Sequence, residues 1–187
     1  SDLVGKDNAD FFYPISIVEK DSILDKCKEI KIDGISSIAS DLAVLTVDYV
    51  AENMGLNANS IRCSEIATNK FLMRNAFKKN DDPIPQFMEV SDNTIFDISN
   101  FKLPLIVKPT DRSGSRGITK ITDINQLKDA IHSACSESFE KKAMIEEFAE
   151  GDEYSVECIS FHGKHTFLAI TQKKKKKTPP IFYNQKK

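Results

Sequence analysis

Leu105-Ile106-Val107-Lys108-Pro109-Thr110-Asp111-Arg112-Ser113-Gly114-Ser115-Arg116-Gly117-Ile118 is the most informative stretch of this chain. An apolar run carries one lysine, breaks at a proline, and is followed by a short loop of small residues with two arginines. A lysine that ends a strand places an ammonium at the edge of a sheet, and a Ser/Gly/Arg loop offers backbone N–H groups and guanidinium donors. A polyphosphate requires those donors, so the stretch indicates nucleotide chemistry.

The composition is that of a soluble globular protein. The chain has 187 residues, of which 40% are hydrophobic and 29% charged. Its net charge of −2 gives no support to a nucleic-acid or anionic-membrane partner. No apolar run approaches the roughly 18 residues of a membrane span, and the N-terminal residues lack the pattern of a signal peptide. The cysteines are far apart, so we expect reduced thiols in a cytoplasmic protein: Cys27, Cys63, Cys135 and Cys158.

The first third of the chain predicts an α/β arrangement. Strand-like runs at 13–18 and 35–39 alternate with helices at 22–30, after Asp21, and 42–54, after Asp41. Such alternation is typical of βαβ packing and a parallel sheet. Two strands make too small a sheet, so either further strands come from elsewhere or the chain begins inside a domain.

The remainder predicts an α+β unit built on antiparallel strands. Thr68 is the expected N-cap of a helix, residues 84–87 are extended, and 91–103 form a linker with one short turn. The later elements are strands at 105–108 and 118–121, a helix at 124–134, a strand at 143–148, and a hairpin of 154–161 with 165–170. We therefore predict domains at 1–65, 66–103 and 104–187.

Five features follow one another from the middle of the chain. Lys70 opens a helix, Lys108 ends a strand, and the loop 113–117 comes next. Met144-Ile145-Glu146-Glu147-Phe148-Ala149 and Gly151-Asp152-Glu153-Tyr154-Ser155-Val156-Glu157 complete the series. ATP carries about four negative charges, which two well-separated ammonium groups in a low-dielectric cleft would balance. Gly114 and Gly117 would let the loop approach the phosphates closely.

This order resembles the ATP-grasp superfamily of carboxylate–amine and carboxylate–thiol ligases. The resemblance covers about residues 66–175, and the first 65 residues resemble the C-terminal part of the preceding Rossmann-like domain of such enzymes. It implies a partial Rossmann-like pre-ATP-grasp domain followed by ATP-grasp subdomains with an antiparallel sheet. The implied reaction forms an acyl phosphate from a carboxylate and ATP, which an amine then attacks.

The resemblance also implies the roles of the site residues. The lysines and the loop would hold the phosphates, with Arg116, ahead of Arg112, as the phosphate donor. Glu146 or its neighbouring carbonyl would accept from the adenine amino group, and the Phe148 N–H would donate to a ring nitrogen. Glu153 would hold the ribose. The expected nucleotide-binding residues are Lys70, Lys108, Ser113, Gly114, Ser115, Arg116, Gly117, Glu146, Glu147, Phe148 and Glu153. No residue qualifies as a general base, and we predict no metal ligand within this chain.

The chain also departs from the family pattern. Glu147 stands where family members often have a lysine, and the acidic residue, Glu and Asn that hold two Mg²⁺ ions in the family have no counterpart here. The expected Mg²⁺ ligands therefore lie mostly outside a chain that we expect to be truncated at both ends. The run Lys173–Lys177 is more typical of a solvated tail than of a phosphate site, with Lys173 its best candidate for one.

Three interpretations remain open from the sequence. The chain is an ATP-grasp ligase acting on a small-molecule carboxylate and amine, a truncated or degenerate ATP/ADP-binding module without catalysis, or a domain of a larger enzyme like carbamoyl-phosphate synthetase or a carboxylase. Enzymatic turnover depends on whether the full gene supplies the missing metal-binding region. Exposed sheet edges would favour association into a homodimer.

Overall fold

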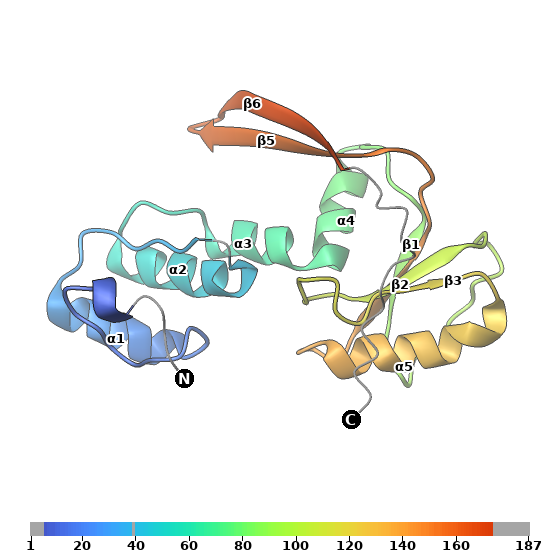
Figure 1. Ribbon diagram of the computed structural model, residues 1–187, viewed down its shortest axis with the longest axis horizontal. Helices are drawn as coiled ribbons and strands as arrows, with labels where there is room; N and C mark the ends of the chain where they lie inside the picture. Colours follow the sequence, from blue (N-terminus) through green and yellow to red (C-terminus); the bar gives the residue numbers. More distant parts are fainter. Residues whose placement is uncertain (1–5, 39, 174–187) are drawn as a thin grey trace. The chain divides into compact units, whose positions relative to one another are not determined.

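The computed structural model describes residues 6–38 and 40–173, and the chain divides into two compact units (Figure 1). Unit 1 is Ser1–Phe148, and unit 2 is Ala149–Lys187. The domain boundaries near residues 66 and 103 rest on a change in the order of expected helices and strands, and they stay predictions. The two compact units of the structure meet between Phe148 and Ala149. None of the helices within the described ranges is long and apolar enough to cross a membrane.

Unit 1 opens with helices: η1 (Lys6–Asn8), α1 (Lys20–Ile30), α2 (Asp41–Met54), α3 (Ile61–Thr68) and α4 (Lys70–Lys79). Buried Leu24 and Cys27 of α1 pack against Val50 of α2. Ser40, not Asp41, caps α2 by accepting from the N–H of Ala43. Gly55 ends this helix at φ 67°, as the sequence predicts, because only glycine takes the left-handed conformation without cost.

The prediction of two strands in the first third of the chain, at 13–18 and 35–39, is wrong. Residues 13–18 and 35–38 contain no strand, and the side chains of Val18 and Ile38 are exposed by 58% and 93%. An apolar run becomes a strand only beside a neighbour that takes its backbone hydrogen bonds, and the described part of residues 1–65 contains no strand at all. A parallel sheet therefore does not form there.

A four-stranded antiparallel sheet forms the other part of unit 1. Its strands are β1 (Phe87–Val90), β2 (Leu105–Pro109), β3 (Thr119–Ile121) and β4 (Ala143–Glu147), in the order β1-β4-β2-β3. The hairpin of β2 and β3 around the 110–118 loop is confirmed. β4 is an inner strand, which brings Glu146 opposite Ile106 of β2 and Phe87 of β1.

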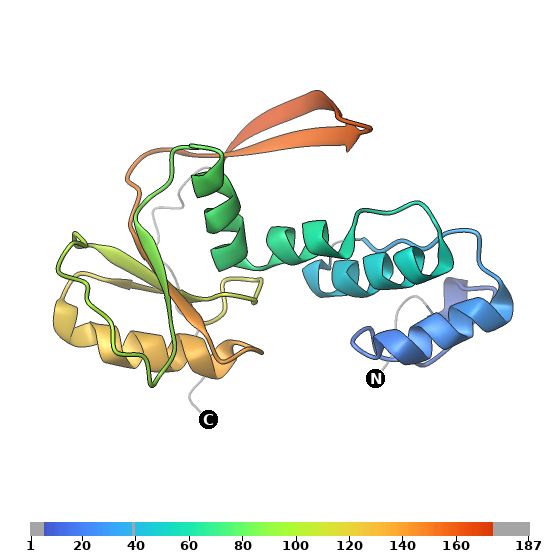
Figure 2. The same ribbon diagram turned by 180° about the vertical axis from the view of Figure 1, so that it is seen from behind.

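The two faces of this sheet are covered differently (Figures 1 and 2). Leu105, Val107 and Ile145 alternate onto one face and form the core with α5 (Leu127–Glu137), which follows the short η2 (Ile124–Gln126). α4 lies over the other face, where the rings of Phe71 and Phe87 meet edge to face at 5.7 Å. Lys108 and Glu146 alternate onto this second face, under α4.

Asn69 determines where α4 begins. Its side chain accepts from the N–H groups of Phe71 at 3.0 Å and Leu72 at 3.1 Å. The prediction of Thr68 as the cap is wrong, because Thr68 is the last residue of α3 and donates its hydroxyl back to the carbonyl of Ser64. The N–H of Lys70 donates to the carbonyl of Thr110 at 2.8 Å, which ties the first turn of α4 to the end of β2.

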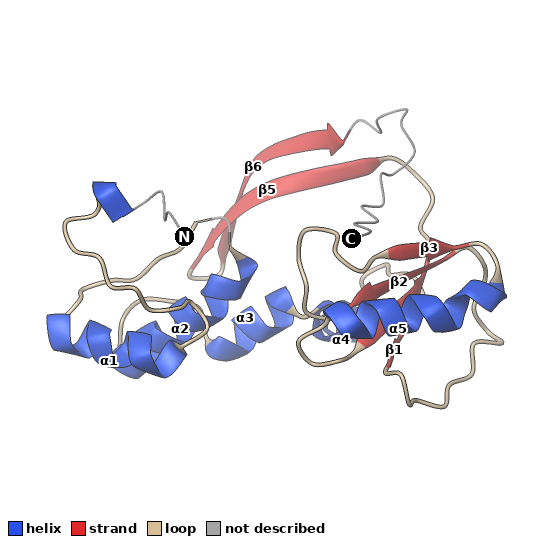
Figure 3. Ribbon diagram, turned by 60° about the horizontal axis from the view of Figure 1, so that its bottom comes forward, coloured by secondary structure: helices blue, strands red, loops and turns tan. Residues whose placement is uncertain are grey.

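Unit 2 is the hairpin of β5 (Glu153–Phe161) and β6 (Lys164–Lys173), drawn in red in Figure 3. The expected turn is confirmed: His162 and Gly163 take φ values of 47° and 74°. A register shift at Glu157/Cys158 leaves Leu168 as an extra residue in β6. The lysine run beyond Lys173 lies outside the described residues.

Candidate functional site

Three cationic side chains and one carboxylate converge between α4 and the sheet. Glu146 is 7% exposed and accepts from Lys108 Nζ on Oε1 and from Arg74 Nε on Oε2, the latter at 3.0 Å. A buried carboxylate is costly unless it is paired, and this one has a different cation on each oxygen. Lys70 completes the group, which we call the cation cluster: Lys70, Arg74, Lys108 and Glu146.

The surroundings of Lys70 lower the pKa of its ammonium. Burial and the neighbouring positive charge of Lys108 lower its pKa below the ordinary 10.5, while Asp111, Asp41 and Glu146 act in the opposite direction. Its ammonium donates to the backbone carbonyl of Arg112, at the start of the loop. Two like charges brought close in a partly buried place are unfavourable unless an anion joins them. Lys70 and Lys108 therefore bring two positive charges near the carboxylate of Glu146.

The structure brings together Lys70, Lys108 and Glu146, which the sequence predicts for the site, and adds Arg74. Sequence reasoning missed Arg74, although one signal was available: it stands four residues after Lys70 and therefore shares its helix face. Lys120 was also missed. Lys120 lies on β3, opposite Ile106 of β2, and its ammonium is 3.4 Å from the centre of the Phe148 ring.

The loop after β2 holds several residues in the left-handed conformation. Gly114, Ser115 and Gly117 have φ values of 70°, 57° and 64°. For Ser115 this conformation costs roughly 1–2 kcal/mol, and such strain clusters at ligand-binding sites. Successive backbone turns of this kind point N–H groups into a concavity that suits anions. Among the described residues, the exposed side chains of Ser113, Ser115 and Arg116 have no hydrogen-bond or ion-pair partner.

The base of the loop is anchored to the end of α5. Asp111 accepts from the N–H groups of Phe139 at 3.2 Å and Glu140 at 2.8 Å. Arg112 packs its guanidinium over the Phe139 ring, 4.4 Å from the ring centre, and reaches Glu137 at 3.7 Å. Arg112, which the sequence favours only weakly as a phosphate donor, is therefore engaged in holding the loop, and Arg116 is the arginine left at its exposed tip.

The adenine-slot residues are engaged with protein partners. The N–H of Phe148 donates to the carbonyl of Pro104 at 3.0 Å. It is therefore already used within the protein, whereas the sequence analysis expects it to be free for adenine. Glu147 leaves the cluster and accepts from the N–H of Lys102 at 2.8 Å, in agreement with the alternation that separates it from Glu146. The carboxylate of Glu146 is shared by two cations. These nucleotide roles stay predictions.

Glu153 belongs to unit 2. It stands opposite Lys173 at the open end of the hairpin, and the two side chains form an exposed ion pair. Its predicted ribose contact is not tested by the contacts within the hairpin. The pair also gives Lys173 a partner, so neither residue is an isolated charge.

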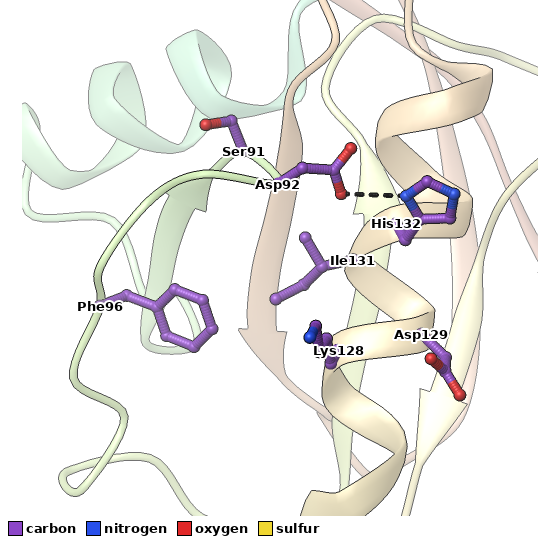
Figure 4. A pocket seen from close by; sticks show the side chains of 7 residues that line it. All are labelled: Ser91, Asp92, Phe96, Lys128, Asp129, Ile131 and His132. Carbon is purple, nitrogen blue, oxygen red and sulfur yellow. Dashed lines mark hydrogen bonds and ion pairs between the residues drawn. The ribbon is translucent and has the colours of Figure 1, made fainter.

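No group of three or more His, Cys, Asp or Glu side chains within the described ranges is arranged to hold a metal ion. A separate hollow of about 380 Å³ lies between the 91–96 segment and α5 (Figure 4). His132 Nδ1 and Asp92 Oδ1 lie 3.3 Å apart there, and both side chains are well exposed. α5 covers the opposite face of the sheet, so this hollow is not part of the cation cluster.

Comparison with known proteins agrees with the geometry. The family model described as "ATP-grasp domain" matches residues 101–184. The D-alanine--D-alanine ligase of Azobacteroides pseudotrichonymphae is 39% identical over 75 residues, which is 40% of this chain and 22% of that protein. The alanine--anticapsin ligase of Bacillus subtilis is 25% identical over 220 residues, covering 96% of this chain and 45% of that protein.

Solved structures share the fold. An L-amino acid ligase from Bacillus licheniformis superposes with a TM-score of 0.70 at 23% identity, over 87% of this chain and 38% of that one. Identity at this level speaks for the fold alone. The chain spans less than half of the length of these relatives.

Proposed function

We propose that this chain, whose residues 101–184 match the family model of the ATP-grasp domain, belongs to the ATP-grasp superfamily and supplies nucleotide-binding parts of an ATP-dependent ligase. The ligase activates a carboxylate as an acyl phosphate and passes the acyl group to an amine. The observation that carries this proposal is the cation cluster beside the strained loop. Lys108 and Arg74 pair with Glu146, Lys70 donates to the carbonyl of Arg112 at the start of the loop, and Arg116 lies exposed in the loop.

The reaction requires stabilisation of negative charge more than proton transfer. An oxygen of the substrate carboxylate attacks the γ-phosphorus of ATP, the bond to the bridging oxygen of ADP breaks, and an acyl phosphate forms. The amine nitrogen then attacks the acyl carbon, inorganic phosphate leaves, and the amine loses a proton to solvent or to a base that this proposal does not assign. Lys70 and Lys108 would offset the negative charge of the transferred phosphoryl group. Two unit charges about 4 Å apart interact by on the order of 4 kcal/mol at an effective dielectric of about 20.

We infer amino acids as the substrate class, with an amino-acid carboxylate as acceptor of phosphate and a second amino acid as the amine. The support is that similar proteins are a D-alanine--D-alanine ligase, an alanine--anticapsin ligase and an L-amino acid ligase. A domain of a carbamoyl-phosphate-synthetase-like enzyme stays a prediction without such support. The alternative of a non-catalytic ATP/ADP-binding module predicts nucleotide binding without amino-acid-dependent turnover.

The finer parts of the proposal concern the metal, the location and the assembly. Mg²⁺ enters as the partner of ATP, and we assign no ligand for it among the described residues. All four cysteines, which lie in the described ranges, are free thiols, in keeping with a cytoplasmic location. We keep a homodimer as a proposal.

Titration of the chain with ATP, in a calorimeter and in the presence of Mg²⁺, tests the nucleotide site. We expect saturable binding that Lys108→Met weakens tenfold or more, since tenfold is about 1.4 kcal/mol. Lys128→Met is the matched control, because this exposed lysine lies on α5, over the opposite face of the sheet. Absence of ATP binding at millimolar concentrations, or equal effects of the two variants, would refute the proposal.

Turnover separates the ligase from the binding module. Phosphate release from ATP in the presence of alanine and other amino acids supports the ligase. ATP binding without any amino-acid-dependent phosphate release supports the non-catalytic alternative for this chain.

A further inference from the structure

We propose that Arg74 is a positioning residue that shares the carboxylate of Glu146 with Lys108, so that Lys108 is held by one carboxylate oxygen and is released more easily to a polyphosphate. The inference rests on the proposed nucleotide site and assigns a role within it to a residue outside the predicted set. It is carried by the way in which the two oxygens of Glu146 are divided between two cations.

The position of Arg74 is well defined by the fold. Lys70 and Arg74 are four residues apart on α4 and project from one face of the helix, toward the sheet. The guanidinium reaches across to β4 and meets Oε2 of Glu146 at 3.0 Å, between side chains exposed by only 23% and 9%. Residues 74 and 146 are 72 positions apart in sequence, so this contact exists only in the folded chain.

The charges of the cluster explain why such a contact matters. Three cations and one carboxylate leave the cluster with two net positive charges. Without the charge of Arg74, one net positive charge remains, and both oxygens of Glu146 are free to turn to Lys108. A lysine held by a fully available carboxylate in a partly buried place would have to break that pair before it met a phosphate. Arg74 therefore acts on the ligand through Glu146 and Lys108.

An arginine suits this position because its planar guanidinium holds a carboxylate in a fixed orientation and stays charged at all accessible pH values. A lysine there retains the charge and part of the pairing, whereas a glutamine retains only a hydrogen bond. Arg74→Lys is thus the conservative replacement, and Arg74→Gln removes the charge that the inference invokes.

The test is calorimetric titration of ATP with Mg²⁺ into the chain and its variants. We expect Arg74→Gln to weaken binding about tenfold and Arg74→Lys to restore it to within about threefold. Arg62→Gln is the matched control, because Arg62 pairs with Glu65 at 3.4 Å on the exposed surface of α3. Thermal unfolding of each variant checks that the fold is retained, and Arg74→Lys, which retains the ion pair, keeps the test decisive if Arg74→Gln unfolds.

A double-mutant cycle with Glu146→Gln separates positioning from a direct or merely structural role. Once Glu146 has no charge, Arg74 has nothing to restrain, so adding Arg74→Gln to Glu146→Gln should change ATP affinity less than twofold. Fully additive effects, or an Arg74→Lys variant as weak as Arg74→Gln, would overturn the inference. If Arg74→Gln binds ATP within twofold of the parent while Lys108→Met binds it tenfold more weakly, the inference about Arg74 is overturned. The proposed function stays intact in that case. Absence of binding by the parent chain would instead refute the proposed function.

Discussion

Gly117 is the most constrained glycine of the loop after β2, and its replacement by alanine gives a sharp prediction. Its φ of 64° lies in the left-handed region, and a Cβ added there would meet Pro109 Cγ at 3.0 Å and Glu137 Cβ and Cγ at 3.1 Å. Pro109 is fully buried in β2, and Glu137 is the last residue of α5, so neither neighbour moves freely. Gly114, in the same loop at φ 70°, has nothing within 4 Å of an added Cβ.

The two glycines therefore separate the conformational cost from the steric cost. Gly114→Ala should pay only for a left-handed alanine, roughly 1–2 kcal/mol. Gly117→Ala has the same conformational cost and also overpacks the site, which typically destabilises a protein by about 1–3 kcal/mol. We expect the second variant to lose about 2–5 kcal/mol of unfolding free energy.

Urea unfolding of both variants and of the parent chain, followed by circular dichroism, measures this difference. In a domain of this size, each kcal/mol corresponds to a shift of roughly 2–4 °C in Tm, so thermal scans should order the three proteins in the same way. Equal destabilisation by the two substitutions would show that the Gly117 contact with Pro109 and Glu137 is not close in solution, and would refute the reasoning about how the loop is seated.

Two further predictions concern Lys70 and the residue that precedes it. Burial and Lys108 lower the pKa of Lys70, and a polyphosphate favours the charged form of this lysine, so ATP affinity should be full below that pKa and fall as the pH rises through it. Calorimetry across pH 7–10 should find a flatter dependence of ATP affinity on pH for Lys70→Arg than for the parent chain. The same pH dependence in both proteins would contradict a role for Lys70 in binding ATP. Asn69→Ala should lose about 1–2 kcal/mol of stability in urea unfolding, because the 8% exposed Asn69 caps α4 through two N–H groups. Ser60→Ala, which removes the exposed cap of α3, should lose less, and the reverse order would count against the role of Asn69.

The local elements that carry their own signals were predictable from the sequence. The β2–β3 and β5–β6 hairpins and α5 follow from alternating apolar residues and from their turns and caps. The segments at 13–18 and 35–38 have the same local pattern as strands, yet they are not strands. A strand is completed by its neighbours, and no local pattern supplies them.

Within the site, the sequence by itself determined which donors are available, because a lysine in an apolar strand and a Gly/Ser/Arg loop have these properties wherever they lie. Only the tertiary structure decided how they are used. It joined Arg74 to Glu146 across 72 residues, turned Arg112 back onto Phe139, and gave the N–H of Phe148 to Pro104. Pairing of a buried charge depends on which groups the packing of α4 on the sheet brings within a few ångströms, and that proximity is a property of the folded chain alone.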